Sequence, residues 1–206
     1  MPRATARRPA AAADPQGVVP RRLLTVATRL FARKGYDRTT VQEIVDAAEV
    51  TKGAMYHYFA SKDDLLHEIY ARVLRMQMER LESFADQDAP VEERLRAASA
   101  DVVVTSIANL DDSRIFFQSM HQLSPAKQKA VRAERRRYHE RFRLLVEEGQ
   151  RSGVFRDDTP AELVVDFFFG SVHHLATWYR RGGPLGPQQV ADSFADLLLT
   201  SLRHQK

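Results

Sequence analysis

Apolar residues recur at intervals of three and four along most of the chain, which is the spacing of one face of a helix. Alternation of apolar and polar residues, the pattern of a strand, is absent over any useful length, and no internal repeat is present. Glycine and proline mark the breaks between segments. The pattern therefore predicts an all-α fold of about nine helices, with approximate ranges 20–35, 41–48, 52–59, 63–81, 91–109, 112–123, 125–151, 161–180 and 187–202.

Two short helices separated by a turn are predicted within residues 39–59, which read TTVQEIVDAAEVTKGAMYHYF. Thr40 and Glu43 have the spacing of a capping box, which begins the first helix. Thr51 can cap the second helix through its hydroxyl, and Glu49 lies in the turn. This arrangement predicts a helix-turn-helix motif.

The second short helix is predicted to bury Met55 and Phe59, and Tyr58 is assigned mainly to the core. Its outward positions are small, polar, cationic or aromatic: Thr51, Lys52, Gly53, Tyr56 and His57. Such a helix fits the major groove of DNA, which is wide enough to admit it. Glycine inside a helix costs about 1 kcal/mol, and close approach to a sugar–phosphate backbone is a reason for glycine at this position.

This part of the chain resembles the helix-turn-helix of the tetracycline-repressor (TetR) family of bacterial transcription regulators. The residues that carry the resemblance are Phe31, Gly35, Tyr36, Thr39, Thr40, Val41, Ile44, Ala47, Ala48, Val50, Thr51, Lys52, Gly53, Tyr56, His57, Tyr58, Phe59, Ser61, Lys62, Leu65 and Leu66. The remainder of the chain has no comparable signature. The resemblance implies an N-terminal helix-turn-helix DNA-binding domain and a C-terminal helical ligand-binding and dimerisation domain.

Three regions are predicted: a disordered basic tail over residues 1–17, the DNA-binding domain over 18–62, and the ligand-binding and dimerisation domain over 63–206. The tail is rich in alanine, proline and arginine, so it is either a plain flexible tail or a basic arm for the minor groove. The helix that begins near Asp63 directly follows the second short helix and is expected to link the two domains mechanically.

The net charge of +4 is unevenly distributed. Residues 1–60 carry ten Lys/Arg and five Asp/Glu, whereas residues 61–206 carry 21 and 22. The positive excess coincides with the helix-turn-helix, which indicates a nucleic-acid partner. A second charged stretch, residues 132–143, is interpreted as a solvated helix face, with a second nucleic-acid surface as the alternative.

Phosphate contacts are expected from three positions that the resemblance makes typical backbone contacts: Thr40, Tyr56 and Lys62. Base edges are expected to be read by Thr51, Lys52, Gly53 and His57. Arg21 and Arg22, at the start of the first helix, either meet phosphate or are solvated.

Aromatic and apolar residues dominate the C-terminal half, and core packing is the alternative interpretation for each of them. The candidate ligand-binding residues are Val104, Phe116, Phe117, Met120, His121, Phe167, His174 and Trp178. Val73, Leu74 and Met78 of the linking helix can also line a ligand chamber.

The helix over 161–180 is expected to begin with a capping box at Thr159 and to be too apolar for a solvated face. With the last helix it would form a four-helix bundle between two subunits, and the resemblance implies the same homodimer. His173 and His174 point about 100° apart, so no metal site and no cofactor are expected.

Cysteine is absent, which excludes disulfides, thiol catalysis and cysteine-ligated zinc. No glycine-rich phosphate loop, nucleophile elbow or HExxH motif is present, so the enzyme hypothesis rests only on scattered His and Asp residues. The N-terminus lacks a signal-peptide core, and apolar runs are shorter than a membrane span, so a cytoplasmic protein without a membrane partner is expected.

The expected function is a ligand-responsive, sequence-specific transcriptional regulator that binds double-stranded DNA at an inverted-repeat operator. By the resemblance, it is a repressor released by a small-molecule inducer, and the aromatic residues indicate an apolar inducer. Residues 174–185 are similar to members that respond to fatty-acyl or steroid-derived CoA thioesters. The alternative is a ligand-independent architectural DNA-binding protein.

Overall fold

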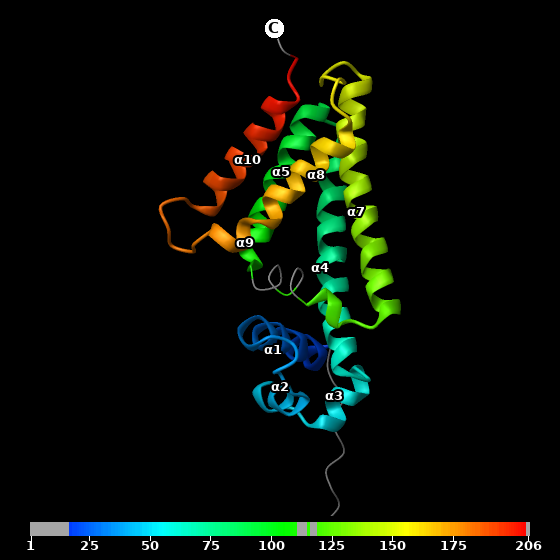
Figure 1. Ribbon diagram of the computed structural model, residues 1–206, viewed down its shortest axis with the longest axis vertical. Coiled ribbons are helices and arrows are strands. Elements are labelled where there is room, and N and C mark those ends of the chain that lie inside the picture. Colours follow the sequence, from blue (N-terminus) through cyan, green and yellow to red (C-terminus); the bar gives the residue numbers. More distant parts are fainter. Residues whose placement is uncertain (1–16, 111–114, 116–118, 205–206) are drawn as a thin grey trace, which may run out of the picture.

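The computed structural model of the protein describes residues 17–110, 115 and 119–204. Every regular element in this part of the chain is a helix, so the all-α prediction is confirmed (Figure 1). The elements are α1 Val18–Lys34, α2 Val41–Ala47, α3 Lys52–Tyr58, α4 Lys62–Ala85, α5 Val91–Ala108, the short 3-10 segment η1 Met120–Gln122, α7 Pro125–Arg151, α8 Ala161–His173, α9 Leu175–Trp178 and α10 Pro187–Ser201. The predicted tail up to residue 16 lies outside the described residues, as does most of the first half of the helix expected over 112–123.

The ends of the short N-terminal helices follow the predicted capping. The Thr40 hydroxyl accepts a hydrogen bond from the Glu43 amide at 3.2 Å, and the Glu43 carboxylate accepts one from the Thr40 amide at 2.8 Å, which completes the capping box. The Thr51 hydroxyl accepts from the Ala54 amide at 3.1 Å. Glu49, in the turn between α2 and α3, has a φ of 52°, a left-handed conformation that is uncommon for residues other than glycine.

Helix α4 belongs to both domains and runs upward from α3 in Figure 1. Leu66 and Tyr70 are buried in the N-terminal core, whereas Leu81 and Ala85 are buried in the C-terminal core. The Tyr70 hydroxyl also donates a 2.8 Å hydrogen bond to the carbonyl of Ile115. The two domains therefore pack directly against each other along one continuous helix.

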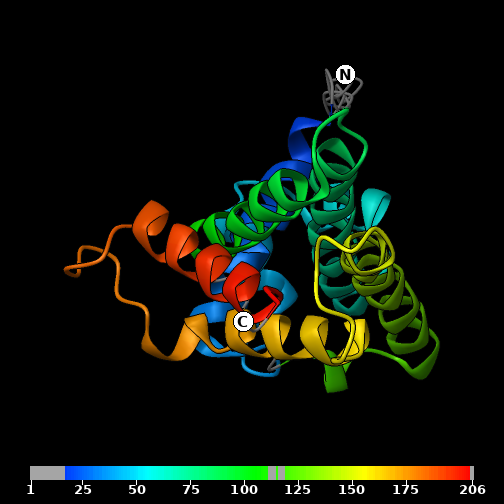
Figure 2. The ribbon, with the colours of Figure 1, turned by 90° about the horizontal axis from the view of Figure 1, so that it is seen from above.

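The C-terminal domain is a layered helical bundle in which α5 packs against α4, α7 and α10. Phe142 of α7 is fully buried and stacks on Phe168 of α8, with ring centroids 5.2 Å apart. Seen from above, α10 lies beside α5 on the side of the bundle away from α7, and α8 extends from α7 toward α10 (Figure 2).

Two details of the predicted C-terminal helices are wrong. The helix predicted over 161–180 is interrupted at His174, where the amide bonds to the Ser171 carbonyl and tightens the last turn of α8. Helix resumes as α9 and ends at Trp178, before Arg180. Helix α8 begins after Pro160 without a side-chain cap, so the capping box predicted at Thr159 is not formed. The Thr159 carbonyl instead accepts a hydrogen bond from the Gln150 side chain at 2.8 Å.

Candidate DNA-binding surface and ligand chamber

The outer face of α3 carries the residues that the sequence assigned to DNA. Met55 is fully buried and Phe59 is nearly so, and these two side chains fix which face of α3 points outward. The exposed residues on that face are Thr51, Lys52, Gly53, Tyr56 and His57. Tyr58 is 37% exposed and packs edge-to-face on His57, so its assignment mainly to the core is wrong. The structure thus brings five of the seven predicted DNA-binding residues together on one short helix.

No steric contact within the described part of the protein requires glycine at position 53. A Cβ atom built at this position would meet only the Thr51 hydroxyl oxygen, at 3.8 Å, which is an ordinary van der Waals contact. A side chain here would instead project from the exposed face of α3. The open space fits a close approach of the backbone to an external partner.

Lys62 has a different environment from the one predicted. Its ammonium donates hydrogen bonds of 2.9 Å to the carbonyls of Tyr36 and Thr39, and it lies 4.0 Å from the centroid of the Tyr36 ring. Burial lowers the pKa of Lys62, and the charge of Asp37 partly opposes that shift. Lys62 therefore holds the connection between α1 and α2 in place from within the domain.

Arg22 also has a role inside the domain, which neither of the two interpretations of the sequence anticipated. Its guanidinium donates a 3.2 Å hydrogen bond to the carbonyl of Glu49, the residue with left-handed geometry in the turn. Thr40, the remaining predicted phosphate contact, is exposed at the start of α2. Arg22 and Lys62 therefore stabilise, through backbone carbonyls, the segments that flank α2.

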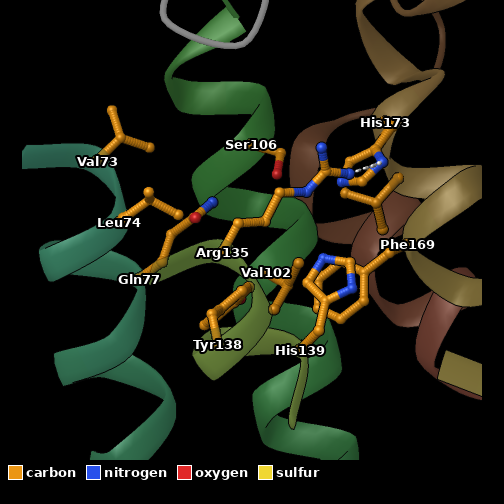
Figure 3. Close-up of a pocket in the computed structure, with 11 residues that line it drawn as sticks. Val73, Leu74, Gln77, Val102, Ser106, Arg135, Tyr138, His139, Phe169 and His173 are labelled. Carbon is orange, nitrogen blue, oxygen red and sulfur yellow. Dashed lines mark hydrogen bonds between the residues drawn. The ribbon is translucent and has the colours of Figure 1, made fainter. Parts of the chain in front are cut away.

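A cavity of about 40 Å³ lies inside the C-terminal domain, between α4, α5, α7 and α8 (Figure 3). We call it the ligand chamber. Most of its wall is apolar or aromatic, and the polar groups come mainly from α7 and α8. The lining residues are Val73, Leu74, Gln77, Val102, Ser106, Arg135, Tyr138, His139, Phe169, Val172 and His173.

Arg135 extends across the ligand chamber toward His173 (Figure 3). Its guanidinium lies 3.3 Å from His173 Nδ1, and His139 stacks on Phe169 with ring centroids 4.2 Å apart. Burial, followed by the charge of Arg135, lowers the pKa of His139 to about 4 and that of His173 to about 3. Both histidines are therefore neutral near pH 7, and Arg135 supplies the positive charge of the lining.

Of the eight predicted ligand-binding residues, the six that the structure describes do not line this chamber. Phe116 and Phe117 lie outside the described residues. Val104 packs against the C-terminal core, and Met120 packs against the N-terminal core. The others are exposed: His121, Phe167, His174 and Trp178. Val73 and Leu74 do line the chamber, whereas Met78 packs in the core beside it.

Arg135 and His139 were missed because they lie in the charged stretch 132–143, which was interpreted as a solvated face. The helical spacing of Arg135 could have indicated that its side chain points inward. Arg135 is four residues after Val131 and three before Tyr138, and these two residues are buried on α7. An arginine within that stripe points inward by helical geometry.

An exposed apolar groove of about 400 Å³ lies between α8 and α10, and we call it the α8–α10 face. Phe167 and Leu197 line it and are each 69% exposed. Leu163, one turn before Phe167, is 60% exposed. Contiguous apolar surface of this kind marks an interaction site.

Within the described ranges, no group of three or more His, Cys, Asp or Glu side chains could hold a metal ion. None of the helices in the described part of the chain is both long and apolar enough to cross a membrane.

Comparison with known proteins gives matches over both domains. Residues 23–69 match the family described as bacterial regulatory proteins, tetR family, and residues 88–202 match the tetracyclin repressor-like C-terminal domain. The transcriptional repressor KstR2 of Rhodococcus jostii is 31% identical over 203 residues, which cover 94% of this chain and 97% of that protein.

Solved structures agree with these matches. The TetR-family regulator PfmR from Thermus thermophilus superposes with a TM-score of 0.80 at 30% identity, covering 89% of this chain and 100% of that one. The ketosteroid transcriptional regulator KstR2 of Mycobacterium tuberculosis has a TM-score of 0.79 at 26% identity, covering 90% of this chain and 95% of that one.

The matched domains and relatives are those of transcriptional regulators and not of enzymes. The C-terminal match alone spans more than half of the chain, and the N-terminal match contains α2 and α3. The protein therefore belongs to the TetR family of bacterial transcriptional regulators.

Proposed function

We propose that the protein is a homodimeric repressor that binds an inverted-repeat operator and is released from it by a largely apolar inducer. The observation that carries this proposal is the position of α4. Its first turn follows α3 directly, and its residues Val73, Leu74 and Gln77 line the ligand chamber. A ligand that moves this wall of the chamber would therefore move α4, the helix that follows α3.

DNA recognition is assigned to the exposed face of α3 and to the start of α2. Lys52, Thr51, Gly53 and His57 would reach base edges, and Tyr56 and Thr40 would contact phosphate. Lys62 would act by holding the α1–α2 connection, since its ammonium already bonds to two carbonyls.

The α8–α10 face is assigned to a second copy of the chain. Phe167 and Leu197 are more exposed than large apolar residues of an isolated monomer usually are. Helices α8 and α10 of each subunit would together form a four-helix bundle. The symmetric dimer would present two α3 helices about 34 Å apart, one turn of DNA.

The inducer is assigned to the ligand chamber. A volume of about 40 Å³ has room for little more than water, so a ligand requires the surrounding helices to move apart. The need for this movement supports coupling between ligand binding and DNA release. If the opened form does not bind DNA, a ligand that binds only that form shifts the population away from the DNA-binding form. The apolar wall supports an acyl thioester of fatty or steroid origin, and the relative from Mycobacterium tuberculosis is described as a ketosteroid regulator.

The test has two stages. An operator is first selected from random duplex DNA, and binding is measured by fluorescence anisotropy over a range of salt concentrations. Metabolites and CoA esters are then screened by thermal shift, and each hit is tested for release of the operator. Reciprocity requires operator DNA to weaken ligand binding by the same factor, so equal ligand affinity with and without DNA would contradict the proposal.

The small chamber volume also supports a second candidate, an architectural DNA-binding protein without a ligand. It predicts sequence-tolerant binding and no ligand-induced shift in melting temperature. A hit that stabilises the protein and releases the operator would eliminate it.

A further inference from the structure

A second hollow adjoins the ligand chamber on the outer side of α7 and α8. It is an open groove of about 380 Å³, and we call it the outer groove. Arg135 and His139 line both the outer groove and the ligand chamber. These two side chains therefore form the boundary between an apolar interior and the protein surface.

The charged residues that line the outer groove are four arginines and three carboxylates: Arg132, Arg135, Arg136 and Arg143, with Glu140, Glu162 and Asp166. Arg132 and Arg136, which are one helical turn apart on α7, are both exposed on its wall. Arg132 bonds to the Gln128 side-chain oxygen at 3.1 Å, and neither arginine forms an ion pair within the part of the chain that the structure describes. Arg143 is different, because it is bonded to Glu140 and Glu147.

The charge at the boundary comes from Arg135. The residues lining the ligand chamber include no Asp or Glu. On the side of the outer groove, the charge of Asp166 acts on Arg135. His139 and His173 add hydrogen-bonding nitrogens without added charge, because burial keeps both neutral near pH 7. An anion in the chamber would thus meet one cation and two neutral imidazoles.

We propose that the inducer is an anionic amphiphile whose apolar part occupies the ligand chamber and whose anionic group binds Arg135 at the boundary. Additional negative charge would extend into the outer groove and meet Arg132 and Arg136. The inference rests on the proposed function, because it assigns the chemistry of that inducer. A free carboxylic acid has its anionic group directly on the apolar chain, whereas a phosphorylated carrier thioester has a neutral thioester there and its phosphates farther out. Both are anionic amphiphiles, and the experiment separates them.

The experiment measures binding to the full-length protein by titration calorimetry with three probes below their micelle-forming concentrations. The probes are dodecanoate, its neutral methyl ester and dodecanoyl-CoA. The variants are Arg135→Gln, Arg135→Lys and the double variant Arg132→Gln with Arg136→Gln. Arg137→Gln is the matched control, because Arg137 is on the same helix, pairs with Glu134 and does not line either hollow.

We expect the unmodified protein to bind dodecanoate about ten- to a hundred-fold more tightly than the methyl ester, as for the gain of a charged hydrogen bond. Arg135→Gln should remove this preference, Arg135→Lys should keep most of it, and Arg137→Gln should keep all of it. If the double variant weakens dodecanoyl-CoA alone by about ten-fold or more, carrier phosphates occupy the outer groove. If it weakens neither anionic probe, the assignment of the outer groove is wrong.

The whole inference is overturned if the ester binds as tightly as the acid, if neither anionic probe binds, or if Arg135→Gln keeps the preference. Circular dichroism of each variant, together with its affinity for operator DNA, separates misfolding from loss of the site. An anionic probe that binds through Arg135 and leaves the operator bound would support the inference and contradict the proposed function.

Discussion

The Lys127 ammonium lies 2.7 Å from the carboxylate of Asp63, and this ion pair joins the first turn of α7 to the first turn of α4. The amide of Ser124 donates to the same carboxylate at 3.2 Å, and Asp64 also accepts a hydrogen bond from Lys127. Hydrogen bonding to Lys127 lowers the pKa of Asp64, so this carboxylate stays ionised near neutral pH. Arg135 of α7 lines the ligand chamber, and α4 follows α3 in the sequence. The ion pair therefore links the helix that bears Arg135 to the helix next to α3.

We predict that Lys127→Met uncouples the two domains. Without the ion pair, movement of α7 around an inducer should be transmitted less completely to α4. The ligand-induced fall in operator affinity should shrink about five-fold or more, while affinity without ligand changes little. Lys129→Met is the matched control, because Lys129 is exposed on the same helix and forms no such bridge. An unchanged ligand response in Lys127→Met would exclude this route.

Gly53→Ala should raise the stability of the protein and weaken its binding to DNA. The built Cβ meets no close atom, so alanine should stabilise α3 by about 1 kcal/mol through its higher helix propensity. If the backbone at Gly53 approaches DNA closely, the same change should weaken operator binding about ten-fold. Thermal denaturation and anisotropy are measured on one preparation. A variant that is more stable and binds DNA as tightly as the parent would show that no close approach occurs.

Lys52 and Lys62 should respond differently to the same substitution. Lys52→Met should weaken operator binding and change its base preference, because Lys52 is exposed on α3. Lys62→Met should instead lower the melting temperature, because it removes two hydrogen bonds of 2.9 Å to backbone carbonyls. Its salt dependence should match that of the parent. A salt slope reduced by about 0.9 in Lys62→Met would restore Lys62 as a phosphate contact.

Phe167→Asp with Leu197→Asp should convert the dimer into a folded monomer. Both side chains are exposed on the α8–α10 face, so charged replacements cost little in the monomer but place carboxylates in a buried interface. Light scattering at micromolar concentration measures the mass. Leu144→Asp is the control, because Leu144 is 40% exposed on α7, outside this face. A dimer that survives the double variant uses another surface.

The free energy of unfolding should fall as the pH drops below about 6.5, which is the pKa of a histidine side chain in the unfolded protein. His139 and His173 have folded pKa values of about 4 and about 3, so the unfolded chain binds more protons in this range. Each histidine contributes a slope of up to about 1.4 kcal/mol per pH unit, with stability present above pH 6.5 and lost toward pH 4. Urea denaturation at about pH 7 and about pH 5 measures the difference, and His139→Gln with His173→Gln should reduce it. An equal loss in the double variant would assign it to other groups.

The sequence by itself determined the all-α fold, the N-terminal caps of the short helices and the outward face of α3. The capping residues Thr40 and Thr51 each act on the amide three positions later, so their effect is local and readable from spacing. The same holds for the outward face of α3, since helical geometry alone fixes which residues lie opposite the buried Met55.

The tertiary structure decided which surfaces meet, because contacts between distant helices depend on how those helices cross. Apolar spacing marks Phe167 as a residue to be covered, but not whether a chamber or a second subunit covers it. Lys62 could be placed at a helix start, but its bonds to Tyr36 and Thr39 require α1 to fold beside it. Gly149 shows the same limit: a Cβ there would lie 2.0 Å from the ring of Phe155, which only the folded turn brings back onto α7.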